Sequence, residues 1–184
     1  MQQASVLILP GWQGSGPLHW QMRWVALHGD VVVEQHDWMR PLRGDWLSRL
    51  DDVLSDLEGP VLLAAHSLGC IQVAAWAAVS AQTHKVKAAL LVAPGDVEAA
   101  NFKDVFSTWQ PIVMNRLPFK SLLVGSQNDP FCTLERAQAF AKAWGSDFLN
   151  LGNKGHVNAD SNLGDWPEGR AMLNSLMKEK EHGH

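Results

Sequence analysis

The sequence has no tyrosine, few cysteines and no long hydrophobic run in its 184 residues. Two cysteines, Cys70 and Cys132, are too few for a disulfide framework and form no metal-binding pattern, so we expect a reducing, cytoplasmic compartment. The first apolar run, within MQQASVLILPGW, follows no positive charge and is too short for a signal peptide or a membrane-spanning helix. These absences favour an intracellular protein that does not enter a membrane.

The sequence also lacks an excess of basic residues. It has 15 Lys and Arg against 19 Asp and Glu, a net charge of −4 with no block of like charge. Binding to nucleic acid or to a membrane surface would require a basic stripe, so we expect neither partner. A hydrophobic content of 46% suits one globular domain over residues 1–184, with a flexible tail from about 179. His182 and His184 in that tail are not expected to form a metal site.

Apolar runs of strand length alternate with stretches of helical period. The expected strands are 6–9, 31–33, 61–65, 86–93, 121–125 and 147–151, and the expected helices are 44–54, 68–81, 133–144 and 166–178. Strands that are apolar throughout and separated by helices indicate a parallel sheet covered on both faces. We therefore predict an α/β fold, a three-layer α/β/α sandwich with a doubly wound, mostly parallel sheet. The irregular segment 96–117 is expected to be a surface excursion.

Polar and glycine-rich stretches follow four of these strands. They are PGWQGSGPLHW, HSLG, GSQNDP and GNKGHVNAD. Because the carboxyl ends of parallel strands meet at one edge of a sheet, we expect these stretches to converge on a single site.

The stretch Ala65-His66-Ser67-Leu68-Gly69 joins an apolar strand directly to an apolar helix. Strand–Gly-x-Ser-x-Gly–helix is the nucleophile elbow of α/β-hydrolases, a sharp turn that exposes the serine hydroxyl at a helix N-terminus. Here alanine replaces the first glycine, a small change that adds one methyl group. The alternative interpretation is that Ser67 only caps the helix, since serine is a favoured capping residue.

A serine nucleophile needs a base, and the base needs a group that orients it. The hydrolase order is Ser, then Asp or Glu, then His, and this sequence supplies Ser67, Asp129 and His156 at three strand ends. In this hypothesis Ser67 attacks an acyl carbonyl, His156 transfers the proton, and Asp129 orients the imidazole. The main rival to Asp129 is Asp96, which follows the strand ending at residue 93.

Several other polar residues fit this chemistry less well. Asp160 and Asp165 follow His156 and so depart from the expected order, and His66 should point away from its neighbour Ser67. Cys70 is expected to be a buried small hydrophobe rather than a nucleophile. The Gly-rich loop 11–16 completes neither a dinucleotide fingerprint nor a P-loop, so no nucleotide cofactor is expected. No metal is expected either, because the cysteines form no metal-binding pattern.

The oxyanion of such a reaction needs two backbone donors. We predict the N–H of Leu68 and the N–H of Trp12, with Gln13 as the second choice for the latter. The shallow substrate pocket is predicted to include Gln13, His19, Trp20 and Trp109 beside Trp12, which would suit an apolar or aromatic acyl group. Trp20 and Trp24 are separated by about one helical turn. A position of Trp20 in the core is therefore an alternative of equal weight.

The chain resembles the small serine hydrolases of the retinoblastoma-binding protein nine and YdeN-like family. The resemblance rests on LPGWQGSGPLHWQ, HDWMRPLRGDW, AAHSLGC, GSQNDPF and, most specifically, GHVNADSNLGDWPEG. It implies a compact α/β-hydrolase without a cap domain, supports Ser67, Asp129 and His156 as the triad, and implies hydrolysis of a small ester or amide, the small-molecule acyl substrate. Esterase and amidase or aminopeptidase activity stay open. A catalytically silent binding or scaffold protein with the same fold is the alternative function.

Overall fold

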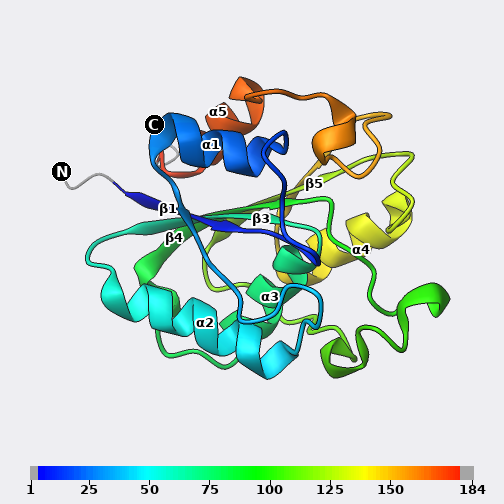
Figure 1. Ribbon diagram of the computed structural model, residues 1–184, viewed down its shortest axis with the longest axis horizontal. Coiled ribbons are helices and arrows are strands. Elements are labelled where there is room, and N and C mark those ends of the chain that lie inside the picture. The colour runs from blue at the N-terminus through cyan, green and yellow to red at the C-terminus, as the bar shows by residue number, and fades with distance from the viewer. Residues whose placement is uncertain (1–3, 179–184) are drawn as a thin grey trace, which may run out of the picture.

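The computed structural model describes residues 4–178 and contains one six-stranded sheet (Figure 1). The strands are β1 (Ser5–Leu9), β2 (Val31–Val32), β3 (Val61–His66), β4 (Val86–Val92), β5 (Lys120–Gly125) and β6 (Asp147–Asn150). The α-helices are α1 (Trp20–His28), α2 (Arg43–Asp56), α3 (Leu68–Ala77), α4 (Leu134–Trp144) and α5 (Pro167–Leu176). The expected flexible tail and its two histidines lie outside the described residues.

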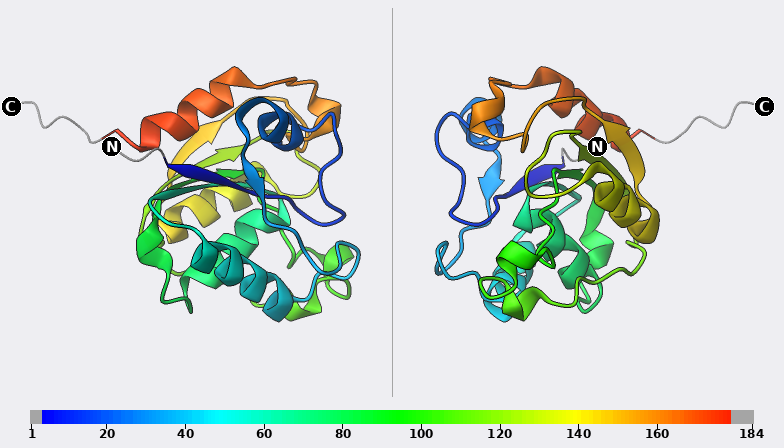
Figure 2. Two further views of the ribbon diagram at one scale, coloured as in Figure 1. Left: turned by 60° about the vertical axis from the view of Figure 1, so that its left-hand side comes forward. Right: turned by 90° about the vertical axis from the view of Figure 1, so that its right-hand side faces the viewer.

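The strand order is β2-β1-β3-β4-β5-β6, and all neighbouring strands pair in parallel. Helices α1 and α5 cover one face of the sheet, and α2, α3 and α4 cover the other (Figures 1 and 2). This arrangement confirms the predicted three-layer, doubly wound α/β sandwich, with a sheet that is parallel throughout. Strand β1 lies between β2 and β3, so the chain passes from β1 to β2 on one side of it and then crosses back to β3 on the other side. Segments that follow β1 and β3 therefore flank the crevice where such folds bind ligands.

The centre of the sheet is apolar because helices cover it on both faces. Every residue of β3 is buried, and its Leu63 pairs in register with Leu7 of β1 and Ala89 of β4. Helix α3 packs directly beneath these strands, and its residues 68–76 are all buried. Its nearly uniform apolar sequence therefore predicted its burial correctly. This rigid centre carries Ser67, which lies between β3 and α3.

Two elements differ from the sequence-based expectation. Helix α1 was not predicted: His19 caps its N-terminus by accepting the N–H of Gln21, and Gly29 ends it in the left-handed conformation, with φ 71°. The segment 96–117 is not simply a surface excursion. Phe106 and Trp109 are buried in the core formed with α2, α3 and α4, because their aromatic area favours burial over exposure.

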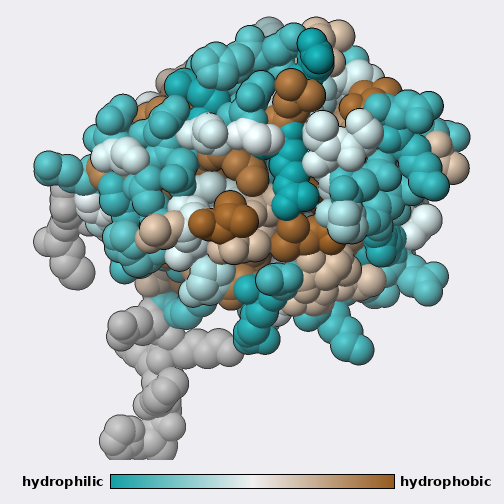
Figure 3. Space-filling model, turned by 90° about the horizontal axis from the view of Figure 1, so that it is seen from below, coloured by the Kyte–Doolittle hydropathy of each residue, from teal (hydrophilic) through white to brown (hydrophobic). Residues whose placement is uncertain are grey.

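Hydrophilic side chains dominate much of the face seen from below, with smaller hydrophobic groups between them (Figure 3). Among residues 4–178, no helix combines the length and apolar character that crossing a membrane requires.

Candidate active site

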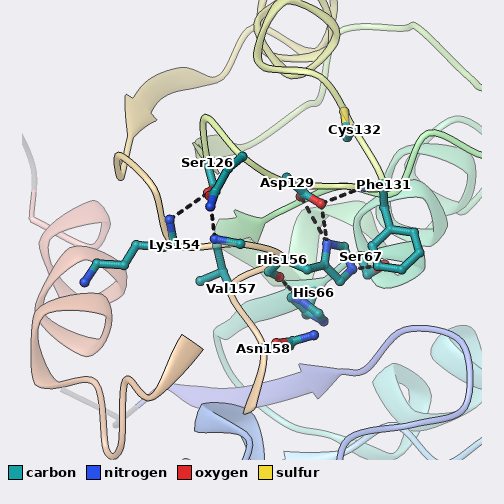
Figure 4. A network of polar contacts seen from close by, with 12 residues as sticks. His66, Ser67, Ser126, Asp129, Phe131, Cys132, Lys154, His156, Val157 and Asn158 are labelled. Atoms are coloured by element: carbon teal, nitrogen blue, oxygen red, sulfur yellow. Dashed lines mark hydrogen bonds and ion pairs between the residues drawn. The ribbon is translucent and has the colours of Figure 1, made fainter. Parts of the chain in front are cut away.

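Three loops at the carboxyl edge of the sheet bring Ser67, Asp129 and His156 together (Figure 4). Nδ1 of His156 lies 2.9 Å and 3.0 Å from the two carboxylate oxygens of Asp129. Nε2 of the same ring lies 2.9 Å from the Ser67 hydroxyl oxygen. The Asp129 side chain is only 2% exposed, so its carboxylate faces the imidazole in surroundings that exclude most water. The imidazole thus bridges a hydroxyl and a buried carboxylate, the geometry required for base-activated attack.

The backbone at Ser67 is held in a rarely populated conformation. Its φ is 55° and its ψ is −120°, and its N–H donates to the carbonyl of Val92 at 3.0 Å. The hydroxyl makes no capping bond to α3 and contacts His156 instead. Ser67 therefore occupies the N-cap position of α3, but its hydroxyl does not cap the helix, contrary to the alternative interpretation. The sharp turn forms with the fully buried Ala65 in the position where the usual motif has glycine.

Close backbone approaches explain two glycines of the site. A Cβ atom on Gly69 would lie 2.2 Å from the carbonyl oxygen of Leu9, and one on Gly11 would lie 2.9 Å from Cβ of Ser67. No side chain fits at these separations. The two glycines allow the loop after β1, the turn after β3 and the start of α3 to pack together.

The N–H groups of Trp12 and Leu68, which lie near Ser67, donate to no backbone carbonyl within residues 4–178. The N–H of Gln13, the second choice from sequence, donates to the carbonyl of Trp38 at 3.1 Å and is already used. A Cβ atom on Gly11 would lie 3.3 Å from the Leu68 nitrogen, so the loop that carries Gly11 and Trp12 passes close to the start of α3. This arrangement favours Trp12 over Gln13 as partner of Leu68 in an oxyanion hole.

The rival carboxylates have other partners. Asp96 forms an ion pair with Arg136, with 3.3 Å between Oδ2 and Nε, and Asp165 pairs with Arg23. Asp129 also accepts the N–H of Phe131 at 2.9 Å, which fixes its carboxylate toward His156.

The loop that carries His156 is held from the far side of the site. Nε2 of His66 lies 2.8 Å from the His156 carbonyl, and because a carbonyl only accepts, this nitrogen carries the hydrogen. The indole N–H of Trp20 donates to the next carbonyl, that of Val157, at 2.9 Å. The prediction that Trp20 lines the pocket is wrong. Its ring lies in the core, where its N–H anchors the loop.

A cavity of about 350 Å³ lies over Ser67. The predicted residues Trp12, Gln13 and His19 line it, whereas Trp109 is buried away from it and donates its indole N–H to the Pro41 carbonyl. Sequence reasoning missed three phenylalanines that also line the cavity: Phe102, Phe106 and Phe131. Phe131 could have been found from its position two residues after Asp129.

Two histidines of the cavity are neutral at neutral pH. Burial lowers the pKa of His19 to about 4, with a further contribution from repulsion by His156. Burial also lowers the pKa of His66 far below its usual range, and repulsion by His156 and His19 acts in the same direction. Neither ring therefore places a positive charge beside Ser67 at pH 7.

The lowered pKa values of His19 and His66 make the stability of the fold sensitive to mild acid. In the unfolded chain His19 would bind a proton below about pH 6.5, while in the fold it resists protonation down to about pH 4. We therefore expect the free energy of unfolding to decrease as the pH is lowered from about 6.5 to about 4. The contribution of His19 to this decrease is on the order of 3 kcal/mol. Urea unfolding at a series of pH values measures this slope.

His19→Asn is the matched control, since asparagine also caps helices but does not titrate. The variant should show a shallower decline of stability between about pH 6.5 and pH 4. A decline identical to that of the wild type would exclude His19 as its source.

Burial also keeps the thiols of both cysteines protonated. It raises the pKa of the Cys132 thiol to about 12 and that of Cys70 well above its usual range, so neither forms a thiolate at neutral pH. In the part of the chain that the structure describes, no three His, Cys, Asp or Glu side chains are grouped to hold a metal ion.

Several solved structures of hydrolases and esterases have a similar fold. The structure resembles a YdeN-like hydrolase from Pectobacterium atrosepticum, with 27% identity, 96% of this chain and 91% of that chain covered, and a TM-score of 0.85. The ydeN gene product of B. subtilis shares 17% identity over 96% of this chain and 100% of that chain, with a TM-score of 0.74. Est1E from Butyrivibrio proteoclasticus shares 15% over 97% and 90%, with a TM-score of 0.69.

A search of curated proteins found no match. The family model described as "Serine hydrolase" matches residues 6–175, nearly the whole chain. The protein therefore belongs to the serine hydrolase family.

Proposed function

We propose that the protein cleaves a small ester or amide through an acyl-enzyme formed on Ser67. The observation that carries this proposal is the position of the His156 ring, within 3.0 Å of both Asp129 oxygens and 2.9 Å from the Ser67 hydroxyl. The hydroxyl oxygen attacks the acyl carbon while its proton moves to Nε2 of His156. Asp129 holds the ring in the tautomer that can accept this proton and stabilises the imidazolium that results.

The rest of the cycle uses the same groups. The carbonyl oxygen becomes negative in the tetrahedral intermediate and accepts the N–H groups of Trp12 and Leu68. The bond to the leaving group then breaks, and His156 returns its proton to the departing oxygen or nitrogen. Water, deprotonated by His156, attacks the acyl-enzyme and releases the carboxylic acid, and the proton returns to Ser67.

Pre-steady-state hydrolysis of a p-nitrophenyl ester tests this mechanism. An acyl-enzyme that forms faster than it breaks down gives a burst of about one p-nitrophenolate per enzyme, followed by a slower steady rate. The burst should disappear in Ser67→Ala. No hydrolysis above the uncatalysed rate with any ester or amide offered would contradict the proposal and favour a silent binding protein with the same fold.

We expect His66 to act as a positioning residue for His156. His66→Leu removes the donor to the His156 carbonyl, so the loop should shift and kcat should fall by about 10²-fold, with a smaller change in KM. His66→Gln places an amide N–H near the position of Nε2 and should restore most of kcat. Steady-state kinetics of both variants measure this difference. Equal losses in the two would show that the hydrogen bond to His156 is not what matters.

We also place the enzyme in the cytoplasm. Cys70 and Cys132 are both free and buried, which suits a compartment where thiols stay reduced.

A further inference from the structure

Four aromatic side chains form a continuous row along the cavity, which we call the aromatic wall: Trp12, Phe106, Phe102 and Phe131. The ring centroids of consecutive members are 5.4, 5.9 and 5.7 Å apart. The last member, Phe131, has its centroid 4.5 Å from that of the His156 ring. The wall therefore runs from the oxyanion loop at one end to the proposed base at the other.

The members of the wall differ in exposure. Phe106 is 6% exposed and packs edge-on against Trp12, whereas Phe131 is 39% exposed. Phe102 lies between them, and Val97 adds a further apolar side chain to this inner part of the cavity. Phe102, Phe106 and Val97 thus give this part of the cavity an apolar surface, which favours an apolar group that leaves water.

A second, more polar hollow adjoins the cavity on the side of the base. Phe131, His156 and Asn158 line both spaces, and in Figure 4 Phe131 lies beside the His156 ring. Most other residues of this outer hollow have polar side chains: Asn128, Asn153, Lys154, Asp160 and Ser161. A ligand that extends past His156 would therefore meet hydrogen-bonding groups rather than an apolar surface.

Reaction geometry assigns these two spaces to the two halves of a substrate. The leaving atom takes its proton from Nε2 of His156, so the leaving group lies beside that ring, which also lines the outer hollow. The carbonyl oxygen faces the N–H groups of Trp12 and Leu68, so the remaining substituent of the acyl carbon is directed toward the inner part of the cavity. Within the aromatic wall, Phe102 and Phe106 thus face the acyl group, and Phe131 faces the leaving group.

We propose that the substrates join an apolar, aromatic or branched acyl group to a polar alcohol or amine, with the acyl group on Phe102 and Phe106 and the polar group in the outer hollow beyond Phe131. This inference rests on the proposed serine hydrolase function. It names the substrate class and divides its recognition between two sets of residues.

The acyl half is tested with p-nitrophenyl 3-phenylpropanoate and p-nitrophenyl acetate. The wild type should prefer the phenylpropanoate in kcat/KM by about tenfold or more, and Phe106→Ala should remove most of that preference. Phe102→Leu provides a milder second variant if Phe106→Ala does not fold. Phe119→Ala is the matched control, because Phe119 packs against the same core but does not line the cavity. A flat preference in the wild type, or an equal loss for both esters in the variants, would overturn the assignment.

The leaving-group half is tested with the 2-hydroxyethyl and propyl esters of 3-phenylpropanoic acid, which differ only in a terminal hydroxyl or methyl. Acylation of the wild type should be faster with the hydroxyethyl ester, by about fivefold or more. Phe131→Ala should slow acylation more than deacylation, because deacylation follows departure of the alcohol.

Faster acylation by the propyl ester, or deacylation slowed as much as acylation in Phe131→Ala, would refute the assignment of the outer hollow. Hydrolysis that depends on Ser67 but shows neither pattern would refute this inference alone. Absence of any Ser67-dependent hydrolysis would remove the proposed function and this inference together.

Discussion

Ser67→Ala is expected to lower kcat/KM for every substrate ester by about 10⁴-fold or more. The hydroxyl oxygen is the atom that His156 contacts at 2.9 Å, and Leu68 and Trp12 offer their N–H groups beside it. Without the Ser67 hydroxyl, water must attack the substrate directly. Only the weak acceleration of that attack by the oxyanion-hole N–H groups should remain. Steady-state ester hydrolysis with purified wild type and variant measures the loss.

Ser48→Ala is the matched control for this prediction. Ser48 is exposed on α2, so its substitution should leave kcat/KM within a factor of about two. Circular dichroism of Ser67→Ala should match the wild type, because the hydroxyl caps no helix. Retention of more than about a tenth of the activity by a folded Ser67→Ala variant would exclude Ser67 as nucleophile.

Gly69→Ala is expected to be the most damaging single methyl addition at the site. The new Cβ would lie 2.2 Å from the carbonyl oxygen of Leu9, so α3 and β1 would have to move apart at the centre of the core. Overpacking of a core costs about 1–3 kcal/mol, and contact with backbone puts this variant at the upper end, equivalent to a fall in Tm of about 10 °C for a chain of this size. Thermal unfolding followed by circular dichroism measures the shift.

Gly44→Ala offers the opposite case within the same protein. Gly44 lies in α2, and a Cβ atom there would contact nothing within 4 Å. Since alanine favours helix more than glycine does, this variant should be as stable as the wild type or more stable, by about 0.5–1 kcal/mol. A Tm for Gly69→Ala as high as that of Gly44→Ala would show that the close approach to Leu9 does not constrain the fold.

The positions of Ser67, Asp129 and His156 could be predicted because each follows a strand of a parallel sheet. Short apolar runs identify those strands, and parallel pairing brings their carboxyl ends to one edge whatever the length of the connections. Chain order then matched the three side chains to the three roles of a triad. The preference for Trp12 over Gln13 as a donor could not be decided in this way, because it depends on the hydrogen bond from Gln13 to Trp38.

The walls of the cavity could not be predicted from local patterns. Phe102 and Phe106 lie in an irregular segment without a helical or strand period, so nothing in their spacing places them over Ser67. Trp20 anchors a carbonyl 137 positions further along the chain, a contact that no sequence spacing encodes. Trp12, Trp20 and Trp109 were predicted as pocket residues, but Trp20 and Trp109 are buried in the core and the phenylalanines make most of the wall.

Labelling with a fluorophosphonate probe is the most direct test of the central claim that Ser67 is an activated nucleophile. The probe reacts with a serine whose proton a neighbouring base can accept, and intact mass with peptide mapping identifies the labelled residue. The account predicts a single adduct on Ser67, absent in Ser67→Ala and much weaker in His156→Ala. No adduct under conditions that label a control hydrolase, or an adduct on another residue that persists in Ser67→Ala, would contradict it.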